Sequence, residues 1–201
     1  MAFNHLKIQP CKAARLGNEV HVAKVDASVL NYIARTNYYF NMTDINIIDN
    51  VFTEDDVKHL HNLFMTKPFN YGETDNDDTP PTGLVQEITD PSLVNYFALN
   101  IHKYFSHLEP AKIYRSYVNL FVPRELPYFH IDGENTLTCI FYINPNYDIN
   151  EGGETQFLLD NKIIGIQPKS GRAVVFNGSI LHRATSFRNF PRLTVALKYN
   201  T

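Results

Sequence analysis

The chain has few cysteines, no excess of basic residues and no long apolar run. Two cysteines, Cys11 and Cys139, cannot form a disulfide scaffold, which favours a reducing compartment. Lysine and arginine number 18 against 21 acidic residues, a net charge of −3, so a basic nucleic-acid surface is not expected. The longest apolar runs, such as residues 139–143, are far shorter than a membrane span, and residues 1–10 contain no apolar stretch of signal-peptide length. We therefore expect a soluble cytoplasmic protein that binds neither nucleic acid nor a membrane.

The composition is sufficient for a folded core. Hydrophobic residues make up 44% of the chain and charged residues only 19%, which is not typical of a disordered protein. The length of 201 residues corresponds to about 1.3 typical domains. We expect one domain over residues 44–201, preceded by an extension over residues 1–43. The extension shows no clear period and could form an edge strand or a partner-binding arm, and the sequence indicates no oligomeric state.

The first half of the predicted domain contains helix signals. Residues 45–48 are isoleucine-rich and predict a short buried strand. Thr53, with Asp56 three residues later, resembles a capping box and predicts a helix over about 53–65. Asp90 followed by proline is a second N-cap signal, and apolar residues at helical spacing extend this helix to about residues 91–107. The acidic, turn-rich segment 70–83 between them is either a surface loop or a lid over a substrate.

After Pro110 the sequence changes to short runs of β-favouring residues separated by turn-like segments. Many short strands without intervening helices indicate an antiparallel sandwich or barrel. The predicted fold class is therefore mainly β with flanking helices (α+β), with the helices on the outside of one sheet. The β-favouring runs lie at residues 113–122, 128–132, 136–144, 155–159, 162–166, 172–176 and 192–199.

His130 and Asp132 are candidate metal ligands. If residues 128–132 form a strand, these two side chains lie on the same face, and they supply two thirds of a facial triad for non-haem Fe(II). A pair at this spacing also arises by chance, so a surface strand with a local His–Asp hydrogen bond is the simpler alternative. His182, which follows a strand and a glycine-containing turn, is the candidate third ligand. The other six histidines are interpreted as surface or packing residues.

The last predicted strand places Arg192 and Thr194 on one face, opposite an apolar face. We expect a hairpin to return both side chains to the neighbourhood of His182. A guanidinium and a hydroxyl there could bind a carboxylate, because the planar guanidinium matches carboxylate geometry. The alternative for Arg192 is a salt bridge at a sheet edge. Tyr142 is predicted to point into the barrel, either toward a ligand or as a core tyrosine with a buried hydrogen bond.

Residues 112–200 resemble the Fe(II)/2-oxoglutarate-dependent oxygenases, in particular their prolyl-hydroxylase branch. The resemblance rests on the order and spacing of several short motifs, with an arginine ten residues after the second histidine. In this respect the chain resembles the arginine-bearing members and differs from collagen-type enzymes, which usually have lysine there. The matching motifs are the H-x-D at His130 and Asp132, LTCIFYIN around Tyr142, GGETQF at 152–157, the P-x-x-G-R-A-V-V-F run ending at Phe176, and His182.

The resemblance implies a double-stranded β-helix (jelly roll) and a prolyl 4-hydroxylase-like dioxygenase. By analogy His130, Asp132 and His182 would bind Fe(II), while Arg192, with Thr194 and Tyr142, would hold the distal carboxylate of the co-substrate. The implied cofactors are Fe(II), 2-oxoglutarate and O2, with ascorbate as a candidate reductant. The reaction would hydroxylate a C–H bond of a peptidyl residue, proline being the first candidate, or of a related small molecule, with release of succinate and CO2.

Two other functions remain as alternatives. A nucleic-acid demethylase of the same superfamily usually carries a second arginine six residues after the first, where this chain has Lys198. A non-catalytic jelly-roll module that binds a metal or another ligand would not need both the complete triad and the carboxylate clamp. The expected partner is thus a peptide, a protein or a small-molecule substrate.

Overall fold

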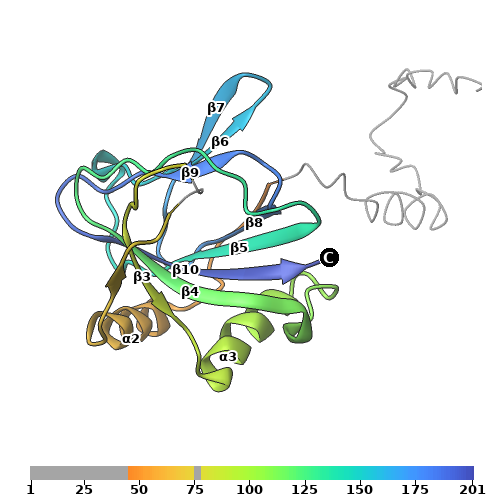
Figure 1. Cartoon of the computed structure of the whole chain (residues 1–201). Coiled ribbons are helices and arrows are strands. Elements are labelled where there is room, and N and C mark those ends of the chain that lie inside the picture. Colours follow the sequence, from red (N-terminus) through yellow and green to blue (C-terminus); the bar gives the residue numbers. More distant parts are fainter. Residues whose placement is uncertain (1–44, 75–77) are drawn as a thin grey trace, which may run out of the picture. The chain divides into compact units, whose positions relative to one another are not determined.

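The computed structural model describes residues 45–74 and 78–201, which form two antiparallel sheets with helices beside one of them (Figure 1). This arrangement confirms the predicted mainly β jelly-roll fold. The predicted extension over residues 1–43 lies outside the described residues. Within the described part, no helix is long and apolar enough to cross a membrane.

The larger sheet contains seven strands in the order β1-β8-β5-β10-β4-β3-β2. β10 lies at its centre and pairs antiparallel with both β5 and β4. The strands of this sheet are β1 (Asn46–Ile48), β2 (Asn70–Tyr71), β3 (Leu84–Glu87), β4 (Ile113–Phe121), β5 (Thr136–Tyr142), β8 (Ala173–Asn177) and β10 (Arg192–Asn200).

The smaller sheet contains three strands in the order β7-β6-β9. They are β6 (Thr155–Leu159), β7 (Lys162–Ile166) and β9 (His182–Ala184). Two short 3-10 helices, η1 (Pro110–Lys112) and η2 (Ile149–Glu151), precede β4 and β6 respectively. The hairpin of β6 and β7 extends beyond the rest of the sandwich at the top of Figure 1.

Both predicted helices are present, and their N-termini are capped as expected. The helix α2 (Glu54–Met65) begins with a reciprocal capping box between Thr53 and Asp56. The helix α3 (Pro91–His102) follows the N-cap Asp90. It ends five residues earlier than the predicted boundary at 107. The apolar spacing continues beyond the helix because the turns that follow bury Leu108 in the same core, so periodicity alone did not show the end.

The main core lies between the two helices and the larger sheet. Phe64 of α2 and Phe97 of α3 pack against Phe141 of β5 and the apolar face of β10. Phe52, just before α2, packs into the same group, with its ring edge-on to that of Phe97 at a centroid distance of 5.4 Å. The prediction that the helices cover the outside of one sheet is therefore confirmed.

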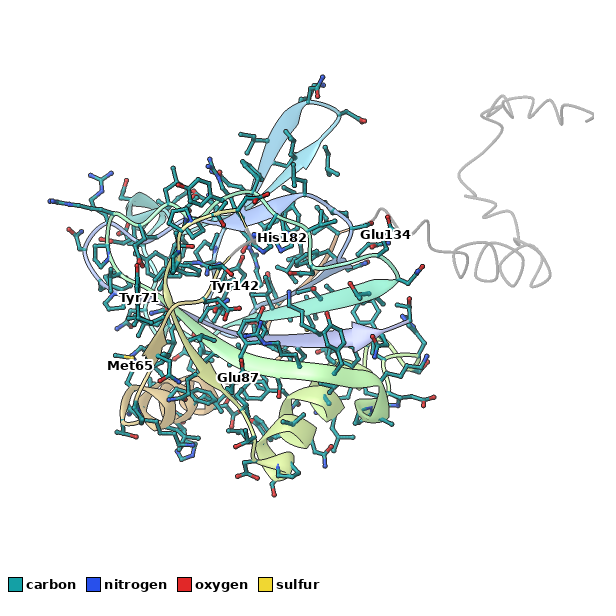
Figure 2. The ribbon with its side chains drawn as sticks, viewed as in Figure 1. Met65, Tyr71, Glu87, Glu134, Tyr142 and His182 are labelled. Carbon is teal, nitrogen blue, oxygen red and sulfur yellow. The ribbon has the colours of Figure 1, made fainter. Side chains whose placement is uncertain are left out.

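The two faces of β10 have different tasks, as the alternation in the sequence predicted. One face packs toward the helices and consists of Leu193, Val195, Leu197 and Tyr199. The other lines a cavity of about 260 Å³ and consists of Arg192, Thr194, Ala196 and Lys198. Figure 2 shows Tyr142 and His182 in the region between the two sheets, whereas Met65 lies at the helical side of the molecule.

We expect Phe97→Ala to destabilise the protein by about 3–5 kcal/mol, because the substitution leaves a cavity in a close-packed aromatic cluster. Leu99→Ala on the same helix is the control, since Leu99 is 55% exposed and its truncation should change stability by about 0.5 kcal/mol or less. Urea unfolding of the two variants measures the difference. Equal losses of stability would contradict the proposed packing of α3 on the sheet.

Candidate active site

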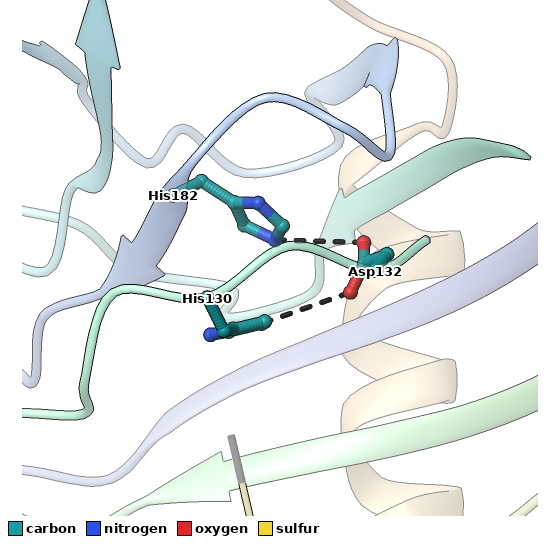
Figure 3. A group of neighbouring side chains, drawn as sticks. All are labelled: His130, Asp132 and His182. Carbon is teal, nitrogen blue, oxygen red and sulfur yellow. Dashed lines mark ion pairs between the residues drawn. The ribbon is translucent and has the colours of Figure 1, made fainter. Parts of the chain in front are cut away.

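Three side chains from distant parts of the sequence meet at one point of the cavity (Figure 3). The ligand atoms of His130, Asp132 and His182 all lie within 4.8 Å of one another. Asp132 Oδ1 is 3.7 Å from His130 Nε2, and Asp132 Oδ2 is 3.5 Å from His182 Nε2. Within residues 45–74 and 78–201 this is the one group of three or more His, Cys, Asp or Glu side chains with such an arrangement. The structure therefore brings together the three ligands predicted from the sequence.

The backbone places the two histidines opposite each other. His130 N–H donates to the His182 carbonyl and His182 N–H donates to the His130 carbonyl, both at 2.9 Å. This pair is an isolated antiparallel bridge, so the expectation of a regular strand over 128–132 was wrong. The two-residue spacing still brings Asp132 to the site, because its N–H donates to the Gly178 carbonyl at 2.7 Å.

Gly178 allows this close approach. A Cβ at Gly178 would lie 3.2 Å from the Asp132 Cβ and 3.1 Å from the Gly133 carbonyl oxygen, and it would overlap the Thr136 hydroxyl. The turn before β9 therefore requires a residue without a side chain at this position in order to lie against Asp132. The predicted glycine-containing turn before His182 thus lets this segment lie against Asp132.

The hydrogen bonds of the two imidazoles orient their Nε2 atoms. His182 Nδ1 lies 2.8 Å from the Ile180 carbonyl and His130 Nδ1 lies 3.1 Å from the Tyr128 carbonyl. A carbonyl oxygen only accepts, so each Nδ1 carries a proton, which leaves Nε2 as the nitrogen for binding a metal. Backbone partners of this kind fix the tautomer of metal-binding histidines.

The donor set fits a divalent transition metal. Metal–ligand distances of about 2.0–2.2 Å place neighbouring ligand atoms of an octahedral ion roughly 3 Å apart. The three candidate ligand atoms, one from each residue, lie within 4.8 Å of one another, so they would move closer together around an ion. Two imidazoles and one carboxylate on one face match the facial triad of non-haem Fe(II) and leave other coordination positions open.

The protonation states of Asp132 and His182 at neutral pH suit metal binding. Burial would raise the pKa of Asp132, but the charges of Lys198 and His182 and hydrogen bonds from Lys198 and Thr138 lower it to about 2. Burial lowers the pKa of His182 to about 4, and the nearby Asp132 only partly opposes this shift. Asp132 is therefore ionised and His182 neutral, which are the forms that bind metal.

Arg192 forms a second functional group on the opposite wall of the cavity. Its guanidinium is 1% exposed and donates to the Gly153 carbonyl at 2.8 Å and to Thr155 Oγ1 at 2.9 Å. Burial lowers the pKa of Arg192. No salt bridge joins it to an acidic side chain in the part of the chain that the structure describes. A buried guanidinium without an anion is costly, so this site fits an anionic ligand such as a carboxylate.

The route by which Arg192 reaches the site differs from the prediction. The expected hairpin with the His182 segment is absent, because β9 belongs to the smaller sheet and β10 to the larger one. Arg192 and His182 instead line the same cavity from opposite sheets. The interpretation of Arg192 as an edge salt bridge is also wrong, since β10 is a central strand.

The surroundings of Arg192 include one residue that the sequence analysis missed. Thr155 lines the cavity and accepts a hydrogen bond from Arg192, while the Tyr142 hydroxyl lies 2.6 Å from the Thr155 hydroxyl. Tyr142 is a buried tyrosine beside Thr155, with its ring centre 5.3 Å from the Arg192 guanidinium, and its contact with 2-oxoglutarate stays a prediction. Thr194 lines the cavity and lies 3.4 Å from Arg192 Nη1. In the sequence, the position of Thr155 directly after Gly152, Gly153 and Glu154 was the signal that could have identified it as a residue near Arg192.

The segment 70–83 borders the cavity. Glu73, Thr74 and Thr82 line its mouth, and Glu73 forms a bidentate ion pair with Arg115 of β4 at 2.8 and 3.0 Å. Residues 75–77 lie outside the described residues, so the lid interpretation stays a prediction. Of the six histidines assigned to surface or packing roles, His5 and His21 also fall outside, and the remaining four do not line this cavity.

Residues 103–199, which contain the triad and Arg192, match the family model of the 2OG-Fe(II) oxygenase superfamily. Over these residues the chain is similar to the superfamily. Its members use Fe(II), 2-oxoglutarate and O2, which confirms the cofactors predicted from the sequence and agrees with the triad; ascorbate stays a prediction. A comparison with curated proteins gave no match.

Solved structures of oxygenases share the fold. A prolyl-4-hydroxylase from Pseudomonas putida is 17% identical, with a TM-score of 0.61, and covers 87% of this chain and 98% of its own. A Trichoplax adhaerens prolyl hydroxylase in complex with a hypoxia inducible factor peptide is also 17% identical, with a TM-score of 0.65 and coverages of 89% and 94%. HygX from Streptomyces hygroscopicus, with nickel, 2-oxoglutarate and hygromycin B bound, is 12% identical, with a TM-score of 0.60 and coverages of 83% and 86%. These matches establish the fold.

We expect the stability of the metal-free protein to fall below pH 6.5 partly because of His182. The folded-state pKa of about 4 lies below the usual 6.5, so the unfolded chain binds the proton first. Stability from this group is present above pH 6.5 and is lost as the pH falls toward 4. Between pH 7 and 5 the loss is on the order of 2 kcal/mol.

His182→Gln should remove this part of the pH dependence, whereas His59→Gln on the exposed face of α2 should keep it. Urea unfolding at a series of pH values in the presence of a chelator measures the slopes. Parallel curves for the wild type and His182→Gln would contradict the low pKa.

Proposed function

We propose that the chain is an Fe(II)- and 2-oxoglutarate-dependent dioxygenase that hydroxylates a C–H bond of a peptidyl residue, with a prolyl residue as the first candidate. One observation carries the proposal. The His-Asp-His group and the buried Arg192, which lacks an acidic partner among the described residues, line the same cavity. A non-catalytic binding module would need one of these features, but not both.

The proposed roles follow from the geometry. His130, Asp132 and His182 would hold the iron through their inward-facing nitrogen and oxygen atoms. Arg192 would bind the distal carboxylate of 2-oxoglutarate, assisted by Thr194 and Thr155. Bound iron, with 2-oxoglutarate and O2, supplies the oxidant for the C–H bond, and the co-substrate leaves as succinate and CO2. The protein binds and orients the reactants and excludes water.

The protein part of the mechanism depends on charge and burial. The guanidinium of Arg192 is held rigidly by the Gly153 carbonyl and Thr155, so little side-chain freedom is lost when a carboxylate binds. In a cavity with little water, a charge-assisted fork is stronger than in bulk solvent. Apolar side chains behind the histidines, including Phe157 and Phe176, keep solvent from the imidazole of His182.

The mouth of the cavity favours a peptide as substrate. Tyr114 and Ile131 line it with about half of their surface exposed, at 47% and 49%, and Glu73 lies at the same rim. An extended chain could lie across such an open rim. The similarity to the Trichoplax prolyl hydroxylase bound to a peptide supports this choice. The similarity to HygX with hygromycin B bound supports a small-molecule substrate as the second candidate.

The proposal predicts succinate release that depends on Fe(II), 2-oxoglutarate and a substrate. Purified protein is incubated with peptides that differ only in having proline or alanine at one position, and in parallel with free amino acids and small metabolites. His130→Ala should lose the substrate-stimulated release because one of three ligands is missing, whereas His59→Ala should keep it. Stimulated release that persists in His130→Ala would remove the proposal.

Arg192→Met should weaken 2-oxoglutarate binding by about tenfold to a hundredfold, because hydrogen bonds to charged groups are each worth about 1.5–3 kcal/mol. The thermal stabilisation of the protein by 2-oxoglutarate in the presence of Mn(II) should fall, while the stabilisation by Mn(II) alone should persist. Arg188→Met, at an exposed position, is the matched control. An unchanged 2-oxoglutarate response in Arg192→Met would show that the anion binds elsewhere.

A further inference from the structure

Lys198 is a buried cation in direct contact with the proposed metal-binding carboxylate. Its side chain is only 7% exposed, and Nζ forms an ion pair with Asp132 Oδ2. Nζ also lies 3.2 Å from Thr138 Oγ1 and 5.8 Å from the centre of the Tyr117 ring. Lys198 has no assigned role in the proposed reaction.

The pairing of strands places Lys198 at this point. Lys198 lies opposite Thr138 in the register of β10 and β5, so both side chains extend from the same face of the sheet. The Thr138 hydroxyl donates to Asp132 Oδ2 as well. This oxygen thus has two donors from the larger sheet, which hold the carboxylate in one orientation.

The charges of the site explain why such a cation is needed. The Asp132 side chain is 7% exposed, and an ionised carboxylate at that depth is costly without a partner. A bound divalent metal would serve as the partner. Lys198 contacts the same carboxylate and would serve as its partner when no metal is bound.

We propose that Lys198 is a positioning residue that acts as the countercharge of Asp132 while the metal site is empty. The inference rests on the proposed function, because it takes Asp132 as a metal ligand. Lys198 keeps the metal-free protein folded with the carboxylate aimed at the two histidines. Because its positive charge repels an incoming divalent cation, it also lowers the affinity of the site for metal.

A simple structural ion pair would behave differently. It would stabilise the protein equally with and without metal. The countercharge role makes the contribution of Lys198 depend on metal occupancy, because the metal takes over the partnership with Asp132.

The test compares the wild type with Lys198→Met, which keeps the length of the side chain and removes the charge. Thermal unfolding is followed with a chelator and with saturating Mn(II), and Mn(II) affinity is measured by calorimetry. Without metal, we expect Lys198→Met to have a lower Tm than the wild type. With saturating Mn(II), the Tm difference between the two proteins should be smaller. The variant should also bind Mn(II) at least about tenfold more tightly than the wild type. Lys169→Met is the control, because Lys169 pairs with Asp49 at an exposed site.

An equal Tm loss with and without Mn(II), or weaker Mn(II) binding in Lys198→Met, would overturn the inference. If Lys198→Met does not fold without metal, refolding with Mn(II) should restore it, and failure to do so would also overturn the inference. In the Asp132→Asn background, Lys198→Met should no longer lower the metal-free Tm. Absence of any Mn(II) response in the wild type would instead show that the proposed metal site itself is wrong.

Discussion

The candidate active site depends on one short backbone bridge between His130 and His182. Its two hydrogen bonds join the segment before β5 to the start of β9, and thereby bring together ligands that are 52 residues apart in the sequence. The bridge also fixes where Asp132 lies, because the next N–H two residues later bonds to Gly178. Loss of the two hydrogen bonds between His130 and His182 would separate the two imidazoles.

Charge is the second constraint, and the site balances it by burial and pairing. Asp132 and Lys198 pair with each other inside the cavity, whereas Arg192 is held by neutral acceptors only, among the residues that the structure describes. The first pair is nearly neutral before any metal binds. The guanidinium is left with capacity for one anion. A divalent cation at the triad and a dicarboxylate at Arg192 complement these two halves of the same cavity.

The sequence predicted those features that depend on local pattern. Alternation along residues 192–199 correctly separated the helix-facing and cavity-facing sides of β10, and the signals at Thr53 and Asp90 correctly placed both helix starts. The triad was also found, although the strand assumed for residues 128–132 is a single bridge. Pattern could not show that β9 and β10 belong to different sheets, because sheet membership is decided by long-range pairing. It likewise gave no sign that Lys198 contacts a carboxylate 66 residues earlier in the chain.

The central position of β10 links stability and chemistry in one strand. Side chains on its two faces alternate, so a shift of one residue in its pairing with β4 or β5 would turn Leu193 into the cavity and Arg192 into the helical core. Burying a guanidinium among phenylalanines costs far more than an ordinary core defect. The same apolar packing that fixes the sheet therefore fixes the register of Arg192, Thr194 and Lys198. The cavity can tolerate polar and charged side chains because the opposite face of the strand supplies the stability.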